Sequence, residues 1–174
     1  MPKIIEDLKS TILEAVANDL TILGYKKLNI RGIAKKCNIA VGTIYNYFSS
    51  KEILVASLMA KNWLESMHKI DNQISSINDL YQGFEIIYNG ILEFKNNYKN
   101  VWSEYTPSMP FYDESKNRHL IFRNQIEERL IKVLEITNNK HYEYFPIITE
   151  LLITCVMQED INFDNLKTFI KKLF

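Results

Sequence analysis

Apolar residues recur every three or four positions along nearly the whole chain, and this spacing constrains the fold more than any other feature. No segment shows sustained alternation of apolar and polar residues, which is the pattern of a half-buried strand. Only five Gly and four Pro interrupt the 174 residues, which favours long helices with few tight turns. Two examples of the helical pattern are the stripes Ile5, Leu8, Ile12, Val16, Leu20, Leu23 and Leu80, Phe84, Ile87, Ile91, Phe94, Tyr98. The sequence therefore predicts an all-α protein.

The ends of the first helices are indicated by residues that commonly cap helices. Gly24 follows the first stripe at the position that favours a left-handed backbone, and Asn29 is a suitable N-cap for a second helix. Ser49 opens a capping signature in which its hydroxyl accepts a hydrogen bond from the N–H of Glu52. The sequence predicts that the second, third and fourth helices span residues 30–37, 41–48 and 49–70.

The rest of the chain divides in the same way. Residues 71–79 break the periodicity and are interpreted as a linker, and residues 106–115 hold two prolines without periodicity and are interpreted as a loop. The predicted helical segments lie near residues 80–98, 101–105, 115–137, 142–158 and 163–173. We expect two domains, a head over residues 1–48 and a larger helical domain over 49–174, connected by the helix of residues 49–70.

The second and third helices are separated by only Asn38, Ile39 and Ala40. Two short helices joined by three or four residues have the spacing of a helix-turn-helix motif. Asn tolerates the left-handed conformation that such a turn requires better than most residues. Ala40 has no side chain that could cap the third helix, so one N-terminal hydrogen bond is expected to be missing.

The third helix has few residues to bury and an unusual set left outside. At 100° per residue, Val41, Ile44 and Phe48 fall on one side, which predicts the face that packs on the head. The remaining positions are Gly42, Thr43, Tyr45, Asn46 and Tyr47. Glycine permits close approach of the backbone, and Thr, Asn and Tyr form hydrogen bonds to phosphates and base edges. The plain alternative is that Thr43 and Asn46 are inert surface residues.

The formal net charge is zero, but the charge is unevenly distributed. Residues 1–52 carry eight Lys or Arg and five Asp or Glu, a balance of +3, which residues 53–174 cancel. Six positive residues and no acidic residue lie between positions 26 and 51: Lys26, Lys27, Arg31, Lys35, Lys36, Lys51. A local basic face of this kind is suited to a phosphate backbone, although charge runs are commonly just solvated surfaces.

The segment "LNIRGIAKKCNIAVGTIYNYFSSKEIL", residues 28–54, resembles the TetR family of transcriptional regulators, and its core "VGTIYNYFSSKE" is a specific signature. The resemblance implies that residues 41–48 form a recognition helix in the major groove of double-stranded DNA. It implies phosphate contacts from Arg31, Tyr47 and Lys51. Thr43, Tyr45 and Asn46 would lie near base edges, with Gly42 allowing close approach. It also implies a homodimer on a pseudo-palindromic operator, acting as a repressor that a small molecule releases.

The larger domain carries an aromatic load that is high for a small helical bundle. Five aromatic residues are candidates for lining an apolar ligand pocket, and ordinary core packing is the alternative for each: Phe84, Tyr88, Trp102, Tyr105, Phe122. No Lys or Arg clearly lies on the apolar stripes, which favours a neutral or cationic aromatic or lipid-like ligand. The loop of residues 106–115 is the expected mouth, and the last two helices are the expected dimer interface.

A different class of function is a helical enzyme or protein-interaction domain with a degenerate DNA-binding head. The sequence holds no Gly-rich phosphate loop and no nucleophile motif. The three His residues are scattered, so neither a metal site nor a cofactor is expected. Cys37 and Cys155 lie far apart, the start of the chain is unlike a signal peptide, and no apolar run approaches a membrane span. We therefore expect a cytoplasmic protein that is not an enzyme.

Overall fold

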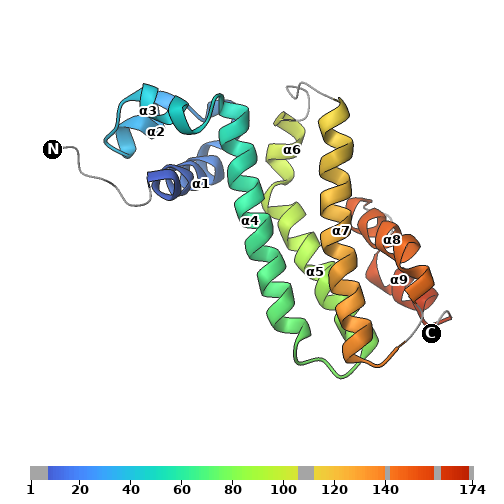
Figure 1. Ribbon diagram of the computed structural model, residues 1–174. Coiled ribbons are helices and arrows are strands. Elements are labelled where there is room, and N and C mark those ends of the chain that lie inside the picture. The colour runs from blue at the N-terminus through green and yellow to red at the C-terminus, as the bar shows by residue number, and fades with distance from the viewer. Residues whose placement is uncertain (1–7, 106–111, 140–141, 159–161, 173–174) are drawn as a thin grey trace. The chain divides into compact units, whose positions relative to one another are not determined.

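The computed structural model describes residues 8–105, 112–139, 142–158 and 162–172 (Figure 1). Within these ranges all regular secondary structure is helical, which confirms the predicted all-α class. The chain forms two compact units. One comprises Met1–Asn62 and Tyr98–Met109, and the other comprises Trp63–Asn97 and Pro110–Phe174. The chain therefore passes out of the first unit after Asn62 and returns to it at Tyr98.

The first unit contains α1 (Leu8–Lys27), α2 (Ile30–Lys36), α3 (Val41–Tyr47), the beginning of α4 (Lys51–Ile74) and α6 (Lys99–Tyr105). Helix α1 packs against α2 and α6, and α2 packs against α3. The core of this unit is made by apolar residues from all of these elements, among them Ile12, Val16, Leu20, Ile33, Ile44, Phe48, Leu54, Val55, Val101. Ile12, Val16 and Leu20 of the predicted α1 stripe are therefore confirmed as buried, whereas Leu8 is half-buried and Leu23 is exposed. The remaining stripe residue, Ile5, lies outside the described ranges.

Two details of this unit differ from the sequence predictions. Gly24 has a non-helical backbone (φ 76°, ψ 171°), as predicted, but one further helical turn follows it and α1 ends at Lys27. Helix α4 begins at Lys51, and its N-cap is Ser50 rather than Ser49. The N–H of Ile53 donates to Oγ of Ser50 at 3.3 Å. Serine is a favoured N-cap residue at either position, and this hydrogen bond identifies Ser50 as the cap.

The second unit contains the rest of α4 with α5 (Leu80–Asn97), α7 (Tyr112–Ile136), the 3₁₀ turn η2 (Tyr142–Tyr144), α8 (Phe145–Met157) and α9 (Phe163–Ile170). Helix α5 packs against α7, α8 and α9, and α8 packs against α7 and α9. On the surface of this unit, Asp71 of α4 forms ion pairs with Arg129 at 2.6 Å and Lys132 at 2.8 Å, both from α7.

Three boundaries in this unit were predicted wrongly. Helix α4 continues to Ile74 through the expected linker, because Ile70 and Ile74 extend its buried stripe. Helix α7 starts at Tyr112, inside the expected loop of residues 106–115; residues 106–111 lie outside the described ranges. The predicted helix from residue 142 begins as a 3₁₀ turn. Pro146 lies in the first turn of α8 and has no N–H to donate to the carbonyl of Tyr142, so an α-helix starting at residue 142 would lack this hydrogen bond.

Candidate nucleic-acid interface

The turn between α2 and α3 has the local geometry that the sequence predicted. The side chain of Asn29 caps α2 by accepting a hydrogen bond from the N–H of Arg31 at 3.0 Å. At the other end of α2, Asn38 takes the left-handed conformation with φ 54°. The N–H of Ile39 then donates to the carbonyl of Ala34 at 3.0 Å, which closes the C-terminus of the helix. These bonds fix the direction in which α3 leaves the turn.

Helix α3 buries few of its side chains and presents the rest to solvent. Ile44 and Phe48 are buried, as predicted, whereas Val41 is half-buried. Tyr45 and Tyr47 are about half exposed, at 49% and 50%, so neither is a core aromatic. The other predicted contact residues are also accessible: Gly42 and Asn46 are exposed and Thr43 is half-buried. As expected, Ala40 makes no side-chain cap, and the N–H of Thr43 donates only to the carbonyl of Ala40.

Gly42 is notable because nothing in the fold requires a glycine there. A Cβ built on Gly42 would have no atom within 4 Å, apart from its own chain neighbours and helix backbone. By contrast, a Cβ at Gly83 would lie 2.5 Å from the side chain of Val133, and one at Gly90 would lie 2.6 Å from Ile70. Packing therefore explains Gly83 and Gly90, whereas the space beside Gly42 opens outward from the exposed face of α3.

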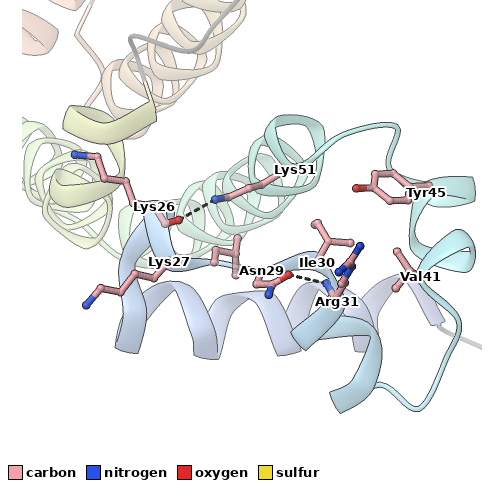
Figure 2. A pocket seen from close by; sticks show the side chains of 9 residues that line it. Lys26, Lys27, Asn29, Ile30, Arg31, Val41, Tyr45 and Lys51 are labelled. Carbon is pink, nitrogen blue, oxygen red and sulfur yellow. Dashed lines mark hydrogen bonds between the residues drawn. The ribbon is translucent and has the colours of Figure 1, made fainter.

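A basic groove lies beside α3, between the end of α1, the start of α2 and the start of α4 (Figure 2). Its volume is about 630 Å³. Nine residues line this groove: Lys26, Lys27, Leu28, Asn29, Ile30, Arg31, Val41, Tyr45, Lys51. Four of them carry positive charge and none carries negative charge, so the groove is suited to an anion. Tyr45 lines the groove and also lies on the exposed face of α3.

Lys51 is held in place by several contacts rather than extending freely into solvent. Its Nζ donates to the carbonyl of Lys26 at 3.5 Å and lies 4.3 Å from the centre of the Tyr25 ring. Desolvation lowers the pKa of Lys51, and the negative charges of Glu52 and Glu104 partly oppose this effect. The hydroxyl of Tyr25 donates to Oε1 of Glu52 at 2.9 Å. The ammonium is thus oriented at the groove wall before any ligand arrives.

Not all of the six cations counted in the sequence line this groove. Lys36 pairs with the buried carboxylate of Asp19, which is only 4% exposed, and this ion pair joins α2 to α1. Lys35 is exposed but is not among the groove residues. The sequence pattern could not distinguish a cation that neutralises a buried acid from one that faces a ligand, because the two partners lie 17 positions apart.

Comparison with known proteins shows what kind of head this is. The family model described as bacterial regulatory proteins, tetR family, matches residues 12–58. The head of this chain belongs to the TetR family. The match covers most of α1, all of α2 and α3 and the start of α4, and so includes the whole helix-turn-helix and all nine groove-lining residues.

Two similar sequences are named as HTH-type regulators of transcription. An uncharacterized HTH-type transcriptional regulator of Bacillus subtilis, YhgD, is 30% identical over 93 residues, which cover 53% of this chain and 49% of YhgD. The HTH-type transcriptional repressor KstR of Rhodococcus jostii is 34% identical over 55 residues, covering 32% of this chain and 26% of KstR. The chain thus spans about half the length of YhgD, and less of KstR.

Solved structures extend the likeness to nearly the whole fold. The regulator FadR from Bacillus subtilis, in complex with stearoyl-CoA, superposes with a TM-score of 0.62 at 15% identity, covering 94% of this chain and 87% of that one. A TetR-family regulator from Streptomyces coelicolor gives a TM-score of 0.59 at 15% identity, covering 86% and 80%. At such low identity these structures establish the shared fold alone.

The five predicted ligand-lining residues fall into three groups in the structure. Phe84 and Tyr88 are buried, and burial raises the pKa of Tyr88. Phe122 is half-buried, with its ring centre 4.8 Å from that of Trp63. The side chains of Trp102 and Tyr105 lie outside the described part of the structure. The structure therefore brings Phe122 against Trp63, which the sequence analysis had not selected.

Trp63 is the centre of an aromatic cluster in the second unit. Its ring packs edge-on against Phe94 at 5.0 Å as well as against Phe122. Its indole N–H donates to Oε1 of Gln125. A polar pair inside an aromatic cluster is the kind of arrangement that orients a ligand in a mostly apolar site. The signal available in the sequence was the alignment of Trp63 with the α4 stripe, which also fits ordinary core packing.

The described residues contain neither a candidate metal site nor a membrane-spanning helix. No group of three or more His, Cys, Asp or Glu side chains is placed there to hold a metal ion. Among the same residues, no helix combines the length and the apolar character needed to span a membrane. Cys37 is half-buried, Cys155 is buried, and both are free thiols.

Proposed function

We propose that this protein is a sequence-specific regulator of transcription that binds double-stranded DNA through α3 and the basic groove. The observation that carries the proposal is the continuity of two surfaces: the exposed polar face of α3 and four groove cations, with Tyr45 belonging to both. Duplex DNA presents base edges in the major groove between two lines of phosphates, so a reader needs both surfaces side by side.

In this proposal the residues have distinct roles. Arg31 and Lys51 neutralise backbone phosphates, and Tyr47 donates its hydroxyl to another. Thr43, Tyr45 and Asn46 lie at base edges, where Asn is suited to the paired donor and acceptor of adenine. Phosphate contacts fix position and orientation, whereas the α3 side chains select sequence.

We further propose that the protein is a homodimer joined through α8 and α9. Helix α8 remains apolar on its outer side: Ile147 is 61% exposed and Met157 is 59% exposed, with Leu151 and Ile153 half-buried. Its inner side is already covered by its own chain. Phe169 of α9 is 45% exposed and adds to the outer apolar surface. A two-fold dimer places two recognition helices on a pseudo-palindromic operator. Sedimentation showing only monomer at micromolar concentration would contradict this part.

The second unit is proposed to bind a small-molecule effector, with release from DNA as the response. Residues 49–174 would then form the ligand-binding and dimerisation domain, and residues 1–48 the head. The aromatic cluster around Trp63 supports an apolar site, and we favour a neutral or cationic aromatic or lipid-like ligand. The stearoyl-CoA in the FadR complex belongs to that protein, and it makes fatty-acyl compounds reasonable first members of a ligand screen.

The DNA-binding proposal is tested with a pool of random duplexes and the full chain. Repeated selection should enrich a pseudo-palindromic sequence, and affinity for it should fall steeply as salt rises. Lys51→Ala should reduce the magnitude of the salt slope by about one, because one phosphate contact is lost. Lys69→Ala, which removes an exposed lysine in the second half of α4, is the matched control and should leave the slope unchanged.

The alternative, an enzyme or interaction domain with a degenerate head, gives a different result. In that case selection enriches no sequence, and Lys51→Ala and Lys69→Ala have the same small effect on binding to bulk DNA. That outcome would overturn the proposed function.

A further inference from the structure

Residues 24–27 form a short turn at the end of α1 whose backbone is held from two sides. The backbone of Gly24 interrupts the helix, and the N–H of Leu28 returns to the carbonyls of Gly24 and Tyr25, each at 3.2 Å. The N–H of Lys26 donates instead to Oε2 of Glu104, in α6, at 2.9 Å. These partners are 78 positions apart in the sequence. A carboxylate that accepts from a backbone N–H makes one of the stronger hydrogen bonds in proteins.

The carbonyl of Lys26 is held by a second residue that lines the groove. The carbonyl of Lys26 accepts the hydrogen bond from Nζ of Lys51, which is visible in Figure 2. The backbone of Lys26 is therefore connected through its N–H to α6 and through its carbonyl to the start of α4. Lys26 and Lys51 are both groove-lining cations. Their relative position depends on this backbone segment.

Helix α6 is itself firmly part of the first unit. It packs along α1, and Tyr98, the residue before it, accepts a hydrogen bond on its hydroxyl from Nδ2 of Asn62 at 2.6 Å. Oε2 of Glu104 would also lie 3.7 Å from a Cβ placed on Gly24, so the carboxylate rests close to the helix break. The segment thus has one anchor at Tyr98 and a second at Glu104.

We propose that Glu104 is a positioning residue for DNA binding: through the Lys26 backbone it fixes the placement of Lys26 and Lys51 in the basic groove. The inference rests on the proposed function. Helix α6, which carries Glu104, follows α5 directly in the chain. Loss of the Glu104 contact would leave the groove cations present but no longer held in one arrangement.

The carboxylate of Glu104 also has an electrostatic effect, which the test must separate from positioning. It is a negative charge near Lys51, and negative charge near a phosphate site weakens phosphate binding. Glu104→Gln and Glu104→Ala remove the same charge, but only glutamine keeps an oxygen that accepts from the Lys26 N–H. The difference between these two variants therefore isolates the hydrogen bond. Glu93→Gln, at an exposed site on α5, controls for the change in net charge.

The experiment measures the affinity of the full chain and its variants for a short duplex of random sequence over a series of salt concentrations. We expect Glu104→Ala to bind about tenfold more weakly than Glu104→Gln, the loss equivalent to about 1.4 kcal/mol. The salt slope of the alanine variant should be smaller in magnitude by about one, since Lys51 is released from its position. Glu93→Gln should match the unaltered chain. Equal affinities and slopes for the two Glu104 variants would overturn the proposal.

Amide hydrogen exchange in the absence of DNA provides a second, independent readout. The Lys26 N–H should exchange faster in Glu104→Ala than in Glu104→Gln, whereas the amides of α2 should be unchanged. If the unaltered chain binds no DNA but this difference in exchange is found, the proposed function fails while the connection between α6 and the groove stands. Equal exchange at Lys26 in the two variants would contradict the connection itself.

Discussion

Replacing Gly42 with alanine should stabilise the free protein and weaken its binding to DNA. Because folding stability and DNA affinity should change in opposite directions, measuring both tests the proposed interface. The added Cβ enters open space, so no clash opposes it in the free protein. Alanine is favoured over glycine in a helix by about 1 kcal/mol, chiefly because glycine loses more backbone freedom on folding. Because Gly42 lies in the first turn of α3, we expect a gain of about 0.5–1 kcal/mol.

The effect on the complex has the opposite direction. If the backbone at Gly42 approaches a base edge or phosphate, the new methyl group occupies space that the DNA needs. Overpacking of a close interface costs about 1–3 kcal/mol, which corresponds to a loss of affinity of about five- to 150-fold. A glycine that is unfavourable for the free helix and favourable for the complex is what a binding surface would retain.

The assay pairs thermal or urea unfolding with duplex affinity, and Gly32→Ala is the matched control. Gly32 also lies in a short helix, and a Cβ there would be in ordinary contact, 4.0 Å from the side chain of Asn29. The control should gain stability without losing affinity. For Gly42→Ala we expect a rise in melting temperature of about 2 °C with weaker binding. A stabilised variant with unchanged affinity would show that DNA does not approach the backbone at Gly42 closely. A destabilised variant would show that the space beside Gly42 is not open in the free protein.

Three other perturbations follow from named contacts. Asn46→Ala should relax preference at particular base pairs by about 1–3 kcal/mol while leaving binding to random duplex nearly unchanged, which a comparison of operator variants measures. Lys36→Ala should lower the free energy of unfolding by about 2 kcal/mol, because the buried carboxylate of Asp19 loses its partner; the Asp19→Asn, Lys36→Ala double variant should recover part of this loss. Burial alone would raise the pKa of Asp71, but hydrogen bonds and charge from Lys132 and Arg129 outweigh it, so the pKa lies below its ordinary value. Stability from Asp71 is therefore present above about pH 4 and lost as the pH falls through the lowered value, so Asp71→Asn should cost more stability at pH 7 than at about pH 3.

Much of the head could be predicted because its determinants are local. Three predicted features each depend on residues within four positions of one another, and each was found as expected. They are the N-cap from Asn29, the left-handed backbone of Asn38 and the missing side-chain cap at Ala40. The same holds for the division of α3 into a buried face with Ile44 and an exposed face with Tyr47. Periodicity and capping chemistry act over one or two helical turns, so a sequence contains them directly.

The remaining features depend on residues that are distant in the chain. Nothing in the sequence places Glu104 against the Lys26 backbone, because that hydrogen bond joins residues 78 positions apart. The aromatic count indicated an apolar interior, but it could not identify Trp63 as the residue that meets Phe122. Contacts of this kind can be identified only from the three-dimensional structure, which also shows which cations line the groove.

The most direct test of the central claim is a titration of the isotope-labelled chain with its selected duplex, followed by amide chemical shifts. DNA binding through α3 and the groove predicts that the largest changes fall within residues 26–31 and 41–51. Changes in α8 and α9 should stay small, since those helices are proposed to join the two subunits. The largest changes in α8 or α9, with residues 41–51 unaffected, would contradict the account.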